Sequence, residues 1–145
     1  MNALCLPLLR AIIRFGAIAL IAGFFGEPAR AGEKRDPYDT VQRAESFTVG
    51  GVGVAGTRTK QELAFREMVK QPQAGLHFRK LLEHGSPAGK MYGLLGLKLT
   101  DRSGFEEALP HFTECETKIE TIGGCMVMHT NVGYVVKQIA RGDFK

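Results

Sequence analysis

The sequence lacks the short motifs that usually mark an enzyme. It has no G-x-S-x-G nucleophile motif and no H-E-x-x-H zinc motif. It also has no C-x-x-C pair of the kind that activates a thiol, and no pair of carboxylates stands in an apolar setting. Basic residues are scattered beside acidic ones, without the basic stripe and interleaved aromatic residues that nucleic-acid binding needs. These absences predict a protein that is not an enzyme and has no nucleic-acid partner.

Long hydrophobic runs are lacking as well. A membrane-spanning helix needs about 20 apolar residues, whereas the apolar run near the start of the chain covers only residues 15–26. Two arginines precede this run, and the small residues Ala29 and Ala31 follow it, in the order typical of a secretory signal peptide. We therefore expect cleavage after Ala31, export to the periplasm or outside the cell, and no stable membrane insertion afterwards. Retention of residues 1–31 as an anchor stays open.

The mature chain is expected to be a single helical domain. Residues 32–56 have the polar and then glycine-rich composition of an extended lead-in with one short strand. Residues 57–145 carry the period of amphipathic helices. We predict about five short helices and a mainly α fold, either a compact bundle or a stack of helical hairpins. The rhythm of short helices and tight turns over residues 59–112 resembles HEAT and armadillo solenoids, without a repeat motif to accompany it.

Three of these helices are predicted over residues 59–70, 73–84 and 87–99, from apolar residues at helical spacing. Charged residues of the first helix, such as Glu62, are expected to face water. The third helix is apolar nearly all round, which predicts a buried central position. It also carries three glycines on one face. Because each glycine within a helix costs up to about 1 kcal/mol against alanine, we expect a neighbouring backbone to approach this face closely.

Two further helices are predicted in the C-terminal part of the chain. Ser103 and Glu106 have the spacing of a capping box, and Pro110 is expected to kink or break the helix that follows. Asn131 is expected to cap the last helix, and Gly142 to end it. Between these two helices the helical period is lost, and a Gly-Gly pair predicts a turn.

Residues 51–56 have the G-x-G-x-x-G form of a dinucleotide-binding loop. The context of this motif disagrees with such a loop, because no second strand follows to complete a βαβ unit. A P-loop is also excluded, since Thr57 and Arg58 stand where Lys and Ser or Thr are required. We interpret the motif as a glycine-rich bend before the first helix, and we predict no cofactor.

Cys115 and Cys125 are the only cysteines that remain after cleavage of the leader. An even number of cysteines in an exported chain favours a disulfide. The Gly-Gly turn before Cys125 could bring the two residues together. The chain-entropy model values such a short loop at roughly 3 kcal/mol of stability.

A soft-metal site is the competing hypothesis for the same segment. Histidine, thiolate and thioether ligands suit Cu(I), and Cys2His2 sets also bind zinc. If residues 125–129 are extended, however, the ends of that segment lie about 13 Å apart, too far for one ion. The candidate ligands are His111, Cys115, Cys125, Met126, Met128 and His129.

The sequence therefore favours a non-catalytic binding or structural role. We expect an exported module that recruits a protein partner through a helical surface. A copper or zinc protein of the cell envelope is one alternative, and an inhibitor or immunity-type protein is another. The identity of the partner and the oligomeric state stay open.

Overall fold

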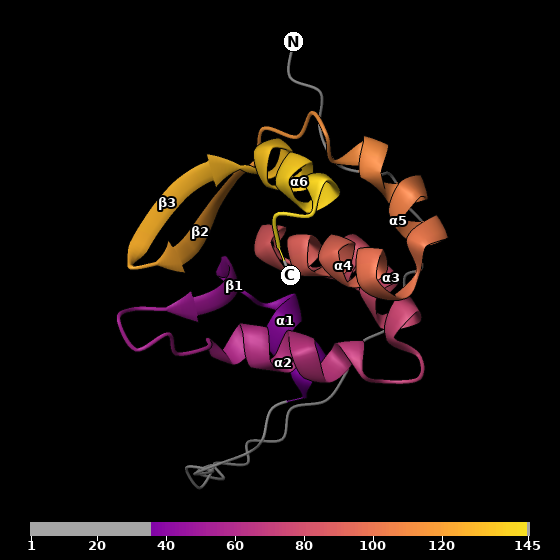
Figure 1. Cartoon of the computed structure of the whole chain (residues 1–145). Coiled ribbons are helices and arrows are strands. Elements are labelled where there is room, and N and C mark those ends of the chain that lie inside the picture. The colour runs from indigo at the N-terminus through magenta and orange to yellow at the C-terminus, as the bar shows by residue number, and fades with distance from the viewer. Residues whose placement is uncertain (1–35, 145) are drawn as a thin grey trace, which may run out of the picture. The chain divides into compact units, whose positions relative to one another are not determined.

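Residues 36–144 are described by a computed structural model of the chain (Figure 1). The predicted signal peptide, with Ala29 and Ala31, lies outside these residues. Within residues 36–144 the chain forms six α-helices, one short 3-10 helix and three strands. In chain order these are α1 Pro37–Gln42, β1 Ser46–Val52, α2 Lys60–Val69, α3 Ala74–His84, α4 Pro87–Thr100, α5 Arg102–Ala108, η1 Leu109–His111, β2 Lys118–Gly124, β3 Met126–Asn131 and α6 Val132–Arg141.

The predicted mainly α fold, whether bundle or HEAT-like stack, is wrong, because the helices share the fold with a mixed three-stranded sheet and the class is α/β. β2 is the central strand of this sheet. It pairs with β1 in parallel and with β3 in antiparallel orientation. The connection from β1 to β2 contains α2 to α5, which gives the chain the length that a parallel pair requires.

The segment between the last two helices, where no regular structure was predicted, forms the β2–β3 hairpin. Gly123 pairs with Met126 across a loop of two residues, Gly124 and Cys125. Gly124 has a φ of +57°, and the tight hairpin turns that match the strand twist need positive φ. The predicted turn is therefore confirmed. The two strands that flank it, β2 and β3, were not predicted.

The lead-in also contains more structure than an extended segment. Pro37 occupies a first-turn position of α1, where it needs no hydrogen-bond partner. The side chain of Asp36 caps this helix by accepting a hydrogen bond from the Tyr38 N–H at 3.0 Å. The predicted short strand is confirmed as β1, which follows α1 directly.

The other predicted helices are confirmed within a residue or two of their ends. The side chains of Thr59, Ser86 and Asn131 cap α2, α4 and α6. Gly142 ends α6 with a φ of +90°. The break near Pro110 is confirmed too, because α5 gives way there to η1.

The start of α5 differs from the predicted capping box. The cap is Asp101, whose Oδ1 accepts a hydrogen bond from the Gly104 N–H at 3.0 Å. Asp101 also holds Arg79 of α3, with Oδ2 at 2.8 Å from Nη2. Both interactions favour the carboxylate, and they lower the pKa of Asp101, the Gly104 hydrogen bond contributing most. Asp101, and not Ser103, is therefore the residue that caps α5.

α4 is the central helix, as its apolar composition predicted, with every residue from Met91 to Leu97 buried. Its glycines allow the expected close approach: a β-carbon on Gly89 would lie 2.8 Å from the carbonyl oxygen of Val41. No helix within residues 36–144 is both long enough and apolar enough to cross a membrane.

Tyr92 ties α4 to the sheet. Its hydroxyl donates to the Thr48 carbonyl at 2.8 Å and accepts from the Thr48 N–H at 3.0 Å. Its ring packs on Phe47, with ring centroids 4.9 Å apart. Burial is the main cause that raises the pKa of Tyr92 to about 12, against the opposing backbone hydrogen bond with Thr48. One side chain thus anchors β1 to the middle of the core.

Candidate functional site

The β2–β3 hairpin carries three consecutive exposed apolar side chains. Met126, Val127 and Met128 of β3 are 64%, 56% and 48% exposed, and Figure 1 shows the hairpin extending away from the helices. β3 is also an edge strand, since β2 is its one partner in the described sheet. Natural proteins usually protect such an edge with charge, proline or a covering segment. Residues 126–131 contain neither a charged residue nor a proline.

The hairpin register determines which backbone groups face the open edge. Gly123 and Met126 flank a two-residue loop, and residues that flank such a loop exchange both backbone hydrogen bonds. Bonded and non-bonded pairs alternate along an antiparallel ladder. Met126 and Met128 therefore bond to β2, whereas Val127 and His129 direct their N–H and C=O groups outward.

The loop between β1 and α2 extends this apolar surface. The Gly53 N–H donates to the Gly124 carbonyl at 2.8 Å, which holds the loop against the hairpin turn. Val54 is fully exposed at this loop. The glycine-rich motif therefore forms the bend that its sequence context favoured, and α2 begins after it, at the Thr59 cap. We call Val54, Met126, Val127 and Met128 the hairpin patch.

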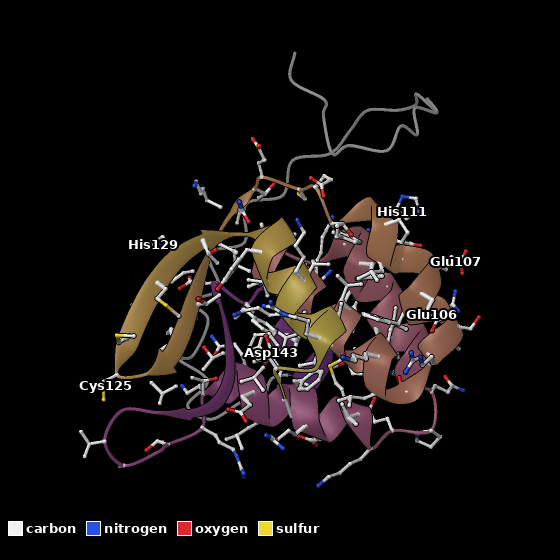
Figure 2. All side chains as sticks on the ribbon, turned by 45° about the horizontal axis from the view of Figure 1, so that its top comes forward. Glu106, Glu107, His111, Cys125, His129 and Asp143 are labelled. Atoms are coloured by element: carbon white, nitrogen blue, oxygen red, sulfur yellow. The ribbon has the colours of Figure 1, made fainter. Side chains whose placement is uncertain are left out.

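The structure does not bring the six candidate metal ligands together. His111 lies in η1 and Cys125 at the hairpin turn, and Figure 2 shows them on separate parts of the molecule. Met126 and Met128 share one face of β3, and His129 lies on the other because side chains alternate along a strand. Among residues 36–144, no group of three or more His, Cys, Asp or Glu side chains is placed to hold a metal ion.

The expected disulfide partners are also apart. Cys115 precedes β2 and Cys125 follows it, so a seven-residue strand separates them, roughly 20 Å or more at 3.3 Å per residue. The Cys115 thiol is half-buried and donates to the Thr117 hydroxyl at 3.4 Å. No cysteine pair in the described part of the chain lies at disulfide distance. Cys125 instead presents an exposed thiol at the hairpin turn.

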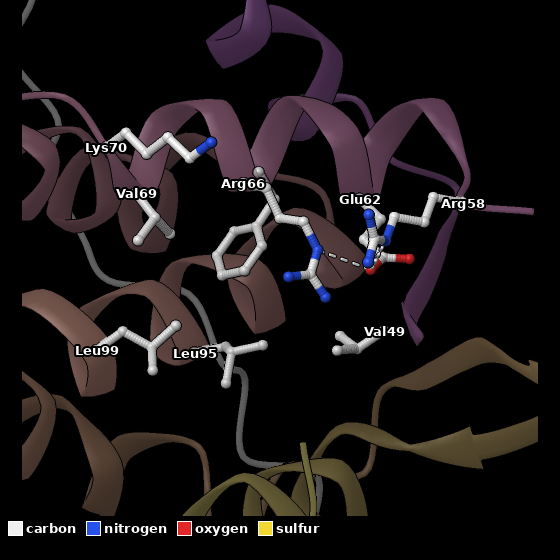
Figure 3. A pocket seen from close by; sticks show the side chains of 9 residues that line it. Val49, Arg58, Glu62, Arg66, Val69, Lys70, Leu95 and Leu99 are labelled. Atoms are coloured by element: carbon white, nitrogen blue, oxygen red, sulfur yellow. Dashed lines mark hydrogen bonds and ion pairs between the residues drawn. The ribbon is translucent and has the colours of Figure 1, made fainter. Parts of the chain in front are cut away.

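A second candidate site lies beneath α2, where Glu62 was expected to face water. Its side chain is instead fully buried, and it lines a pocket of about 300 Å³ between α2, β1 and the C-terminal half of α4 (Figure 3). Oε1 of Glu62 lies 2.9 Å from Nε of Arg66 and 3.6 Å from Nε of Arg58. Oε2 has no hydrogen-bond partner within the described residues.

A charge pattern in the sequence marks this site. Arg58, Glu62, Arg66 and Lys70 recur every fourth residue, a spacing that aligns side chains along one helix face and pairs opposite charges. Of these four residues only Glu62 is buried, and the side chains of Arg58 and Arg66 are 56% and 40% exposed. The burial of Glu62 could not be inferred from α2 alone, because it depends on the elements that pack against this helix. Comparison of the chain with protein-family models, with curated proteins and with solved structures finds no match to any of them.

Proposed function

We propose that this chain is an exported, non-catalytic binding protein that recruits a protein partner through the open edge of β3. The partner supplies an extended segment, which pairs with the outward backbone groups of Val127 and His129. The observation that carries the proposal is the edge strand itself, which combines open hydrogen-bonding groups with exposed apolar side chains. Addition of a strand to such an edge is a recurrent mode of peptide recognition.

The side chains of the hairpin patch give this pairing its expected specificity. The backbone groups of an edge provide affinity for any extended chain, whereas side-chain contacts on alternate positions select among chains. Met126 and Met128 present adaptable thioether side chains on one face, and Val127 lies on the other. Because β3 carries no charge, we expect the partner segment to be apolar and uncharged at the facing positions.

Proline substitution distinguishes strand pairing at the β3 edge from nonspecific apolar binding. Val127→Pro removes an outward N–H and obstructs an incoming strand, while the hairpin bonds to β2 stay in place because they belong to the neighbouring residues. Val127→Thr is the matched control, since it keeps the N–H and a β-branched side chain. The tagged full chain is produced in its own cells and used to capture the partner. The Val127→Thr variant is expected to capture the same partner as wild type, whereas the Val127→Pro variant is expected to lose it.

Two results of this capture experiment would contradict the proposal. Equal capture by wild type and Val127→Pro would show that binding does not use the β3 edge. Sedimentation that reveals a dimer of the chain, lost in Val127→Pro, would show that the edge serves a second copy instead of another protein.

Export is tested separately by the intact mass of the native protein. Cleavage after Ala31 predicts a chain that begins at Gly32. Recovery of the uncleaved chain from the cell interior would contradict the proposed export. The proposed strand pairing at β3 would still be tested by the capture experiment.

A further inference from the structure

We infer that the pocket beneath α2 binds an organic anion with a short apolar body, such as a straight-chain or aromatic carboxylate. This site is separate from the hairpin patch, and the inference does not depend on the proposed function. It rests on three observations: an apolar cavity, an excess of positive charge at its mouth, and a buried carboxylate that holds the cationic groups in position.

The walls of the pocket define the apolar half of the ligand. Its volume of about 300 Å³ is at the lower end of the range typical of small-molecule sites. The cavity therefore suits a short body and not a long lipid chain. Figure 3 shows apolar side chains from α2, β1 and α4 around the opening. They are Val49, Phe65, Val69, Leu95 and Leu99.

The charged residues define the other half of the ligand. Arg58, Arg66 and Lys70 line the pocket with one carboxylate, Glu62, so the charged residues of the lining carry a net charge of +2. Cations beside an apolar cavity attract an anion more strongly than they would in open solvent, because the low-polarity wall reduces screening. An anionic head group is therefore the complement that this cluster lacks.

Glu62 orients the guanidinium groups of Arg58 and Arg66 for such a head group. It contacts both through Nε, and the terminal nitrogens of Arg66 make no hydrogen bond with the described residues. In Figure 3 the guanidinium of Arg66 points into the space beside Leu95, with its terminal nitrogens away from Glu62. A guanidinium presents a planar fork that matches a carboxylate or phosphate. Since Glu62 is fully buried, it fixes this orientation before a ligand arrives.

The cations and the apolar walls together define the expected pose. The ligand places its anionic head on Arg66 and its apolar body between Val49 and Leu95.

Three eight-carbon probes that differ in charge test the inference. Octanoate, 1-octanol and octylammonium are titrated into the ¹⁵N-labelled full chain, and the amide shifts of Phe65, Arg66 and Leu95 report binding in the pocket. We expect saturable shifts with octanoate and at least tenfold weaker binding of 1-octanol. Equal affinities for octanoate and 1-octanol, tighter binding of octylammonium, or no saturable shift at these amides would overturn the inference.

Two variants and a matched control complete the test. Arg66→Gln is expected to weaken octanoate binding at least tenfold and to leave 1-octanol binding nearly unchanged. Arg102→Gln removes an arginine from the same kind of pair, with Nε 2.9 Å from Glu106, but outside the pocket, and is expected to have no effect. Leu99→Trp fills the exposed rim without disturbing the core and is expected to block both probes. Similar octanoate affinities in Arg66→Gln and Arg102→Gln would refute the anion site.

Discussion

Gly96 lies on α4 at a point where a side chain has no room. An added β-carbon would lie 2.5 Å from Cδ2 of Phe78, whereas carbon atoms in contact are about 3.5–4.0 Å apart. The ring cannot move aside, because Phe78 is fully buried and packs on Phe65 with ring centroids 5.6 Å apart. Alanine gains about 1 kcal/mol over glycine in a helix, but overpacking costs about 1–3 kcal/mol, and a clash this close belongs at the upper end. Gly96→Ala is therefore expected to lose about 1–2 kcal/mol of unfolding free energy.

Urea unfolding followed by circular dichroism measures this loss. The midpoint is expected to fall by roughly 0.5–1 M at an unchanged slope. Gly75→Ala in α3 is the matched control, because the nearest atom to its added carbon is Cβ of Asp101 at an ordinary 3.5 Å. There the helix propensity is expected to prevail, and the midpoint should rise. A shift in the same direction for both variants would refute the packing of α4 against α3 described here.

Other perturbations report on the cap, the core and the edge. Because the pKa of Tyr92 is raised to about 12, the folded protein keeps a proton between pH 10 and 12 that the unfolded chain loses. Its stability should fall by up to about 1.4 kcal/mol per pH unit as the pH rises through this window, and Tyr92→Phe should lack that slope in alkaline urea titrations. Asp101→Ala removes the cap on α5 and should lower the urea midpoint at neutral pH. Because the pKa of Asp101 is lowered by the Gly104 hydrogen bond and by Arg79, the difference from wild type should vanish as acid protonates the carboxyl. Val127→Pro should leave the thermal midpoint nearly unchanged, whereas Met128→Pro, which removes a hydrogen bond to β2, should lower it clearly.

The helical part of the fold follows from local signals in the sequence. Thr59, Ser86 and Asn131 cap helices because a hydroxyl or amide oxygen at that position satisfies an unpaired N–H of the first turn, and such signals are readable one residue at a time. The close approach at α4 was predictable for a similar reason. Glycine destabilises the interior of a helix, so three glycines on one face of a buried helix indicate that a neighbouring segment packs closely there.

The sheet and the buried carboxylate depend on contacts that no local pattern contains. β3 is exposed on both faces through most of its length, so it shows no alternation of apolar and polar residues from which a strand could be inferred. Glu62 looks like any solvated helix residue until β1 and α4 cover it. The cap of α5 was misplaced for a different reason, because Asp101 makes the local hydrogen bond to Gly104 that was assigned to Ser103. The sheet and the buried Glu62 share one cause, which is long-range packing that overrides local preference.

Amide hydrogen exchange along β3 tests the central claim that the edge is open in the isolated protein and closes on a partner strand. In the isolated protein we expect fast exchange at Val127 and His129 and slow exchange at Met128, whose N–H bonds to β2. In the complex with the captured partner all three amides should exchange slowly. Equal protection of Val127 and Met128 before any partner is added, or unchanged exchange at Val127 and His129 in the complex, would contradict the account.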